Sequence, residues 1–354
     1  MDAGTAKATQ AFRVETAGRA RYTVAVGAVV ILLVLVLLPT FAGRNLIQDL
    51  IFVFYMLALA QCWNLLAGYA GLISVGQQAF VGLGGYLLFA FTLLGSINPL
   101  LAIPLAGLVS ALFALPTALI VFRLRGAYFA IGTWVVAEVY RLVFAQFKAL
   151  GGGTGTSLDP SVTSSVPGIE WVKTLLDVRT PAARDITTYW IALALAVGTL
   201  ATVYLILRSR RGLALGAIRD QETAAAGLGV DIYRIKLAVY IMTAAMTGMI
   251  GALIYLQKAR ISPDAAFSVL DWTAYVIFIV VIGGIGTMEG PVIGAIIFYL
   301  MQRYLADFGA FYLILLGTLA ILVMLFAPRG LWGVIAERYD LTLFPTRRRL
   351  VTEK

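Results

Sequence analysis

Very few side chains in this sequence could carry acid–base, nucleophilic or metal chemistry. Histidine is absent, which removes the usual general base near neutral pH and the commonest metal ligand. Cys62 is the only cysteine and lies inside an apolar run, so the sequence predicts a buried thiol and no intrachain disulfide. These features argue against a hydrolase or a metalloenzyme, and we expect neither a metal nor a cofactor.

Glu138 and Arg141 are the other candidates for chemistry, because they interrupt an apolar stretch. Three residues apart on a helix, they share a face and can neutralise each other, which lowers the cost of placing charge there. The sequence favours a structural ion pair that faces the interior of a bundle, with a role in a transport path or gate as the alternative. A proton-coupled transporter would need an unpaired carboxylate, so this pairing argues mildly against one.

The run Gly151-Gly-Gly-Thr-Gly-Thr156 resembles a phosphate-binding loop only superficially. Such a loop ends in Gly-Lys-Ser/Thr, and no lysine in this sequence follows a glycine. Any ATP must therefore be bound by another polypeptide. The run is interpreted as a flexible loop, with a docking surface for a delivery protein as the alternative.

Two further glycine-dense segments, residues 68–85 and 283–294, combine small residues with polar ones. Small residues allow close helix packing, but broken helices with polar groups also form substrate sites in membranes. The first segment fits packing and path equally well, and the second favours a tight re-entrant turn or gate. The candidate path or gate residues are Tyr69, Ser74, Gln77, Gln78, Glu138, Arg141, Gly283, Gly284, Gly286 and Glu289.

Long apolar runs must position these residues. The 354-residue chain is 61% hydrophobic and 13% charged, with a mean hydropathy of +0.92, which is more apolar surface than a soluble domain of this size could bury. The sequence predicts an all-α, polytopic membrane bundle over residues 22–327, with broken or re-entrant segments. About ten spans are expected, near residues 22–39, 46–66, 78–94, 100–122, 127–147, 186–207, 237–256, 272–282, 291–304 and 312–327.

The positive charges predict the orientation of the bundle. With the N-terminal tail (1–21) and the C-terminal tail (328–354) in the cytoplasm, the inner segments, which include 123–126 and 208–236, hold 18 of the 27 lysines and arginines. The net charge of +9 is thereby assigned to topology and not to nucleic acid. Residues 148–185 become the largest periplasmic loop.

Two alternatives affect the count of spans. A single kinked helix over residues 272–304 would give nine spans and place the C-terminal arginines outside, so we favour a break at 283–290. The first span could instead be a signal peptide cleaved near Ala42, but its 21-residue polar lead is long for that role.

The inner segment 208–236 is basic and polar between two apolar runs. Alanines after Glu222 favour a short helix with a smooth face, and Gly227 and Gly229 are suited to end it. Such a helix could fit a groove on a partner. The candidate coupling residues are Arg219, Glu222, Ala224, Ala225, Gly227 and Gly229.

These motifs resemble the permeases of ATP-binding-cassette (ABC) importers, and specifically the LivM-type subunit of the branched-chain amino acid importer family. The family pattern Glu-x-Ala-Ala-x-x-x-Gly is matched from Glu222 to Gly229. Motifs at residues 64–80, 123–131, 138–141 and 281–291 resemble the family in the same order, and the similarity covers roughly residues 46–333. Gln77 is a departure, because many members carry histidine there.

The resemblance implies a type II-like ABC importer permease in the bacterial inner membrane. Its expected partners are a second, LivH-type permease, two ATPase subunits that hydrolyse ATP, and a periplasmic binding protein. The segment 222–229 would transmit the ATPase movement, and this chain would carry out no chemistry. The expected cargo is a branched-chain or related hydrophobic amino acid, with urea, short amides or other amino acids as alternatives. A stand-alone secondary transporter or channel is the competing class, and an intramembrane enzyme is a distant third.

Overall fold

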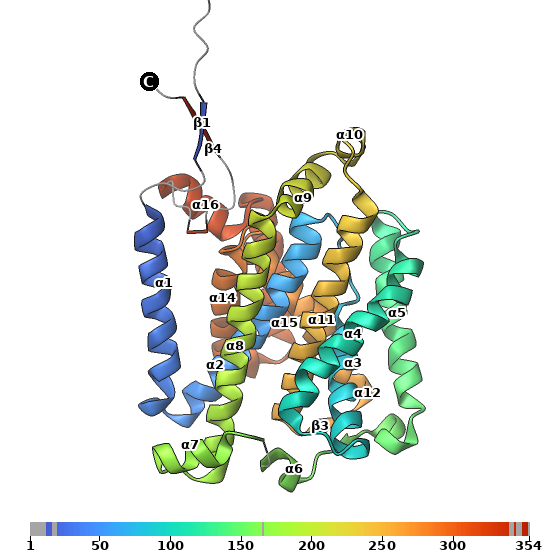
Figure 1. The fold of residues 1–354 in the computed structure, drawn as a ribbon, viewed down its shortest axis with the longest axis vertical. Coiled ribbons are helices and arrows are strands. Elements are labelled where there is room, and N and C mark those ends of the chain that lie inside the picture. Colours follow the sequence, from blue (N-terminus) through green and yellow to red (C-terminus); the bar gives the residue numbers. More distant parts are fainter. Residues whose placement is uncertain (1–11, 16–19, 165, 340–342, 345–348, 353–354) are drawn as a thin grey trace, which may run out of the picture.

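The computed structural model describes residues 12–15, 20–164, 166–339, 343–344 and 349–352, and this part of the chain is mostly helical (Figure 1). The main helices run roughly parallel to one another along the long axis of the molecule. The helices are α1 (Ala20–Leu37), α2 (Arg44–Asn64), α3 (Gln77–Phe89), α4 (Pro99–Val121), α5 (Ala127–Ala145), α6 (Pro160–Ser164), α7 (Ile169–Leu176), α8 (Thr180–Arg208), α9 (Arg210–Asp220), α10 (Glu222–Gly227), α11 (Ile232–Lys258), α12 (Pro263–Ala266), α13 (Tyr275–Gly283), α14 (Gly290–Leu305), α15 (Ala310–Phe326) and α16 (Gly330–Tyr339).

Short turns and strands complete these elements. The 3-10 turns are η1 (Leu38–Thr40), η4 (Lys148–Leu150), η5 (Gly152–Thr154) and η7 (Ala306–Phe308), the π turns are η2 (Leu65–Tyr69), η3 (Ala90–Leu94) and η6 (Leu270–Ala274), and the strands are β1 (Phe12–Glu15), β2 (Thr156–Ser157), β3 (Arg260–Ile261) and β4 (Arg349–Thr352).

Eight helical segments in the described chain are long and apolar enough to cross a membrane. The predicted helical membrane bundle is therefore confirmed. The other two predicted spans are also helical but shorter: the apolar part of the first covers Val26–Thr40, and α14 has 16 residues. The chain turns back between α13 and α14, so residues 272–304 are not one kinked helix.

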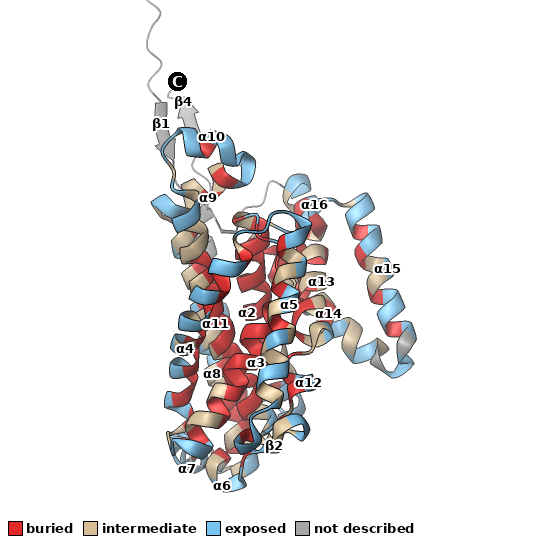
Figure 2. Ribbon diagram, turned by 90° about the vertical axis from the view of Figure 1, so that its right-hand side faces the viewer, coloured by how far each residue is buried: buried red, intermediate tan, exposed pale blue. Residues whose placement is uncertain are grey.

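The core of the bundle lies along α2, where 89% of the span is buried (Figure 2). A second group, α3, α4 and α11, packs together through small residues. A side chain at Gly84 would overlap the backbone of Gly248, and one at Gly251 would overlap the backbone of Val81. In a membrane no hydrophobic effect drives helices together, and close packing of backbones at small residues is one way in which they associate.

The segment between α5 and α8, which includes the glycine-rich run 151–156, contains two short turns, a short strand and two short helices. Its apolar side chains Leu150, Leu158, Ile169 and Val172 are buried in the core. Strand β2 pairs with β3 from the α11–α12 connection, which ties this loop to the bundle. Helix α8 begins six residues earlier than the predicted span, at Thr180.

The two tails meet at the same end of the molecule. Strand β1 pairs antiparallel with β4, so that Phe12 lies opposite Thr352 and Glu15 opposite Arg349 (Figure 1). Both tails therefore lie on the same side of any membrane that the bundle spans.

Candidate functional site

The segment 209–231 forms a hairpin of two helices, α9 and α10, where one short helix was expected. It projects from the end of the bundle that also carries β1 and β4 (Figure 1). The Ser209 hydroxyl accepts a hydrogen bond from the backbone N–H of Arg211 and caps α9. Glu222, at the start of α10, forms an ion pair with Lys236 on α11, which fixes the hairpin to the bundle.

The faces of α10 are not equivalent. Ala225 is only 1% exposed and packs inward, whereas Ala224 is exposed and Leu228, just after the helix, is 82% exposed. Gly229 has φ +83°, a left-handed conformation that glycine adopts at low cost as the chain leaves the helix. No atom lies within 4 Å of the position that a Cβ atom at Gly227 would occupy. The surface available to a partner is therefore formed by Ala224 and Leu228, and Ala225 holds α10 in place.

Arg219, near the end of α9, connects the hairpin to the body of the bundle. Its side chain forms an ion pair with Asp220, with 3.3 Å between nitrogen and oxygen. A side chain at Gly286 would lie 3.5 Å from the Arg219 guanidinium and 3.2 Å from the carbonyl oxygen of Gly68. Gly286 also has φ +74°, so both its conformation and its surroundings favour glycine.

The loop between α13 and α14, residues 284–289, is held against α2 by two amide side chains. Asn64 donates to the Thr287 carbonyl oxygen at 2.7 Å and accepts from the backbone N–H of Gly286 at 2.8 Å. Gln61, one turn earlier, donates to the carbonyl oxygen of Met288 at 2.7 Å. Both amides are fully buried, and together with Arg219 they place the hairpin, this loop and the end of α2 in one cluster.

The other candidate residues in and beside this loop, Gly283, Gly284 and Glu289, contact other parts of the chain. A side chain at Gly283 would overlap the carbonyl oxygen of Gly290, so the two helices meet closely at the turn. A side chain at Gly284 would lie 2.8 Å from the carbonyl oxygen of Arg329. Glu289 is 8% exposed and accepts the backbone N–H groups of Leu343 and Phe344 at 3.1 and 2.9 Å, so it anchors the C-terminal tail to the loop.

The first glycine-dense segment forms a broken span. After η2 the chain is non-helical and irregular over residues 70–76, with Gly71 at φ +69°, and α3 begins only at Gln77. The side-chain amide of Gln77 donates to the carbonyl oxygen of Leu59. Leu59 lies ten residues before the last residue of η2, so α3 begins about 15 Å deeper in the bundle than the end of η2. Such irregular backbone is tolerated in a membrane where protein or water satisfies it.

Polar groups of this broken span form hydrogen bonds with other groups of the same chain. Trp63 donates to the Ser74 carbonyl oxygen, and the Ser74 hydroxyl accepts from the backbone of Gly76. Thr273 donates to the side chain of Gln78. Ser74, Gln77 and Gln78 are buried and Tyr69 is half-buried, so in this conformation the three buried residues do not line an open path. Their role in a path stays a prediction.

Glu138 and Arg141 form the predicted ion pair, but they are not shielded inside the bundle. Arg141 donates to one oxygen of Glu138 from Nε at 2.8 Å and from Nη2 at 2.5 Å, and to Asp264 from Nη1 at 2.6 Å. The side chains of Glu138, Arg141 and Asp264 are 44%, 30% and 81% exposed. Removal of Glu138 would therefore leave Arg141 paired with Asp264.

Sequence reasoning missed four residues that the structure brings into these sites: Gln61, Asn64, Leu228 and Asp264. The two amides carried a usable signal, because each interrupts an apolar span and must find hydrogen-bond partners there. Leu228 is an apolar residue in a polar loop. Asp264 offered no local signal, because its partner is 123 positions away.

Comparison with known proteins gives a consistent result. Residues 45–327 match the family described as "Branched-chain amino acid transport system / permease component". The high-affinity branched-chain amino acid transport system permease protein LivM of Escherichia coli (strain K12) is 29% identical over 319 residues, which cover 86% of this chain and 73% of that protein. LivM of Salmonella typhimurium is 29% identical over 315 residues, covering 85% and 73%. BraD of Pseudomonas aeruginosa, a permease protein of the same kind of system, is 31% identical over 133 residues, covering 36% and 41%. No solved structure matches the chain.

Proposed function

The chain belongs to the branched-chain amino acid transport permease family, and from this premise we propose that it imports branched-chain or related hydrophobic amino acids as one subunit of an ABC importer. It is a multi-pass helical membrane protein and a transport component, not an enzyme. The proposed location is the bacterial inner membrane, with both tails in the cytoplasm.

The observation that carries this proposal is the contact between the α9–α10 hairpin and the interior of the bundle. The hairpin presents the exposed side chain of Leu228 just after α10, while Arg219 near the end of α9 lies next to Gly286. A force applied to the hairpin would therefore reach the 284–289 loop and, through Asn64, the broken end of α2. An importer driven by separate ATPases needs this kind of connection, whereas a self-contained transporter does not.

The proposed partners follow from the missing phosphate-binding motif and from the resemblance to ABC importer permeases. It has no phosphate-binding loop motif, so two ATPase subunits would supply the energy. Its cargo path would lie between this chain and a LivH-type permease, and a periplasmic binding protein would deliver the cargo. ATP binding would close the ATPases, move the hairpin and change the side to which the path opens.

A secondary transporter is less well supported. Ion coupling calls for a carboxylate that can bind and release its ion, and the intramembrane carboxylate Glu138 is already paired with Arg141. Arg141 also forms an ion pair with Asp264.

Reconstitution tests the proposed function. Proteoliposomes with both permeases, both ATPases and the binding protein should accumulate labelled leucine when ATP is present and fail to do so without ATP or without the ATPases. Parallel assays with labelled urea and a short amide identify the cargo class. Accumulation by this chain alone would refute the proposal.

The proposed orientation makes its own prediction. A Ser157→Cys variant should react with a membrane-impermeant maleimide on intact spheroplasts, because Ser157 is exposed in the predicted periplasmic loop. The native Cys62 is buried and should contribute little labelling. Gln221→Cys, exposed between α9 and α10, is the matched control and should react only after the membrane is opened. The reverse pattern would contradict the orientation.

A further inference from the structure

Among the eight helical segments of the described chain that are long enough to cross a membrane, α5 is the one that its own chain covers least. Only 17% of its residues are buried, compared with 89% for the span of α2. Its outer surface is apolar along most of its length, and Trp134 and Val135 are 48% and 51% exposed. The three charged residues of the Glu138–Arg141–Asp264 triad interrupt this surface.

The depth of Glu138 excludes contact with lipid. Glu138 is eleven residues from the start of α5 and seven from its end, or about 16 Å and 10 Å along the axis. Charged groups at this depth face other protein or a water-filled path, because lipid cannot solvate them. The Glu138 side chain is 44% exposed and therefore marks a surface that protein or water covers in the working transporter, and Arg141 connects this surface to Asp264 at the start of the span Pro263–Gly283.

The neighbouring backbone supports the same conclusion independently. The non-helical segment 70–76 packs on α5. The backbone N–H of Val75 donates to the Thr133 hydroxyl, and a side chain at Gly76 would overlap the Thr133 carbonyl oxygen. Ile73 in this segment is 55% exposed. Non-helical backbone within a membrane also lies against protein or a water-filled path and not against lipid.

We propose that the triad and the adjoining face of α5 form one half of the cargo site, and that the triad recognises both charges of a zwitterionic amino acid. This inference rests on the proposed function and adds the residues of this chain that bind the two charges of the cargo. Asp264, the most exposed of the three, would accept hydrogen bonds from the cargo ammonium group. The second permease would supply the other half.

The donors of Arg141 suit the other end of the cargo. A guanidinium has five N–H groups, and the three bonds to Glu138 and Asp264 leave one on each terminal nitrogen for the cargo carboxylate. The triad has a net charge of −1, so it favours ligands that carry an ammonium group. Trp134 and Val135 lie one helical turn from Glu138 on the same face and would contact an aliphatic side chain.

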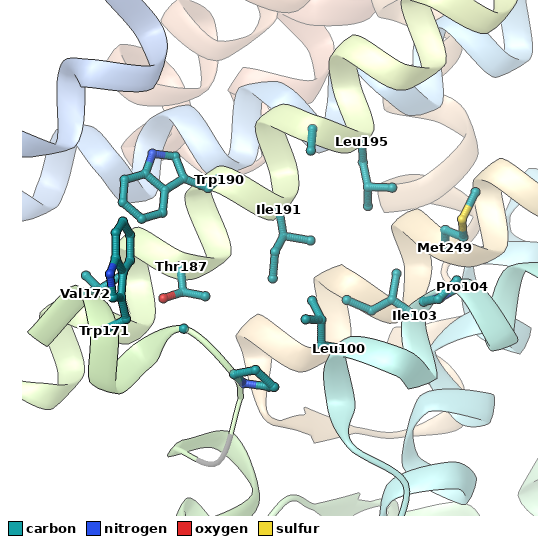
Figure 3. Close-up of a pocket in the computed structure, with 13 residues that line it drawn as sticks. Leu100, Ile103, Pro104, Trp171, Val172, Thr187, Trp190, Ile191, Leu195 and Met249 are labelled. Atoms are coloured by element: carbon teal, nitrogen blue, oxygen red, sulfur yellow. The ribbon is translucent and has the colours of Figure 1, made fainter.

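An apolar pocket elsewhere in the described chain is a poor alternative for such a cargo. It measures about 460 Å³ and lies between α4, α7, α8 and α11 (Figure 3). Its lining includes Leu100, Ile103, Trp171, Ile191 and Met249, and it contains no charged residue. Nothing there could pair with either charge of an amino acid.

The test uses the reconstituted full complex with saturating binding protein. Asp264→Asn should lower the rate of labelled leucine uptake at least tenfold, while assembly, thermal stability and ATPase stimulation by the binding protein stay near wild type. Asp264→Glu should recover a substantial part of the uptake, because it restores the carboxylate. Asp49→Asn is the matched control: Asp49 pairs with Arg303 at 2.5 Å, and its loss should change leucine uptake less than twofold.

Several outcomes would overturn the inference. Leucine uptake by Asp264→Asn within twofold of wild type would remove Asp264 from the cargo site. Equal losses in Asp264→Asn and Asp49→Asn, or loss of assembly in Asp264→Asn, would assign it a structural role. A wild-type complex that accumulates urea or amides but no amino acid would refute the zwitterion site alone, whereas one with no ATP-dependent uptake would refute the proposed function itself.

Discussion

Leu228→Asp is expected to abolish ATP-driven uptake while the permease remains folded and inserted. Leu228 is 82% exposed just after α10 in a polar hairpin, so its apolar side chain is available for a partner. Truncating or charging an anchor residue at an interface costs about 2 to 4 kcal/mol, which weakens association about 30- to 1000-fold. The ATPase subunits should then fail to copurify with the permease.

The measurement combines copurification with uptake in proteoliposomes. Leu175→Asp is the control, because Leu175 is 58% exposed on α7 at the opposite end of the bundle and should leave the ATPase contact intact. Ala225→Arg should also stop uptake, but by displacing α10, and this difference should appear as faster proteolysis of the hairpin. If the ATPase subunits copurified normally with the Leu228→Asp permease, Leu228 would be excluded from the ATPase contact.

Asn64→Ala is expected to uncouple ATP hydrolysis from transport and to destabilise the bundle. The substitution removes the partners of the Gly286 N–H and the Thr287 carbonyl oxygen, and unsatisfied polar groups of this kind cost about 1 to 3 kcal/mol. Gln61 would then be the only one of the two amides that still holds the 284–289 loop against α2, so movement of the hairpin would reach the bundle less effectively. We expect ATP hydrolysis that no longer depends on the binding protein, with uptake close to background.

Thermal unfolding and ATPase assays on the same preparation separate these effects. Asn98→Ala is the matched control, because Asn98 caps α4 through the backbone N–H of Leu100 at an exposed position. Loss of that cap should cost about 1 kcal/mol and leave coupling unchanged. If Asn64→Ala kept coupled uptake, the proposed connection through the loop would be wrong.

Much of the fold could be predicted because lipid imposes strong local rules. Each predicted apolar run forms a helix, and the break at 283–290 separates α13 from α14 as expected. The interruption near residues 68–77 was also visible, since glycines and amides at membrane depth have few structural solutions. These signals are local, and a single sequence is sufficient to show them.

The rest depended on contacts between distant segments. Arg141 could be paired with Glu138 from their spacing, but Asp264 reaches it only through the turn after α11. Ala224 and Ala225 are adjacent and chemically identical, and only the packing of α10 determines which one faces outward. The same limit applies to Ser74, Gln77 and Gln78, whose partners belong to other helices or to a different turn of the chain.

The anchoring of the tail by Glu289 has a practical consequence for anyone handling this protein. Its carboxylate holds Leu343 and Phe344 in the loop that Asn64 also holds, and β4 then pairs with β1. An affinity tag or fluorescent fusion placed after Lys354 would pull on the 284–289 loop, which we propose transmits movement of the hairpin, and a deletion of the last residues would release that loop from the tail. Labels are better introduced near Ser157, in the segment between α5 and α8.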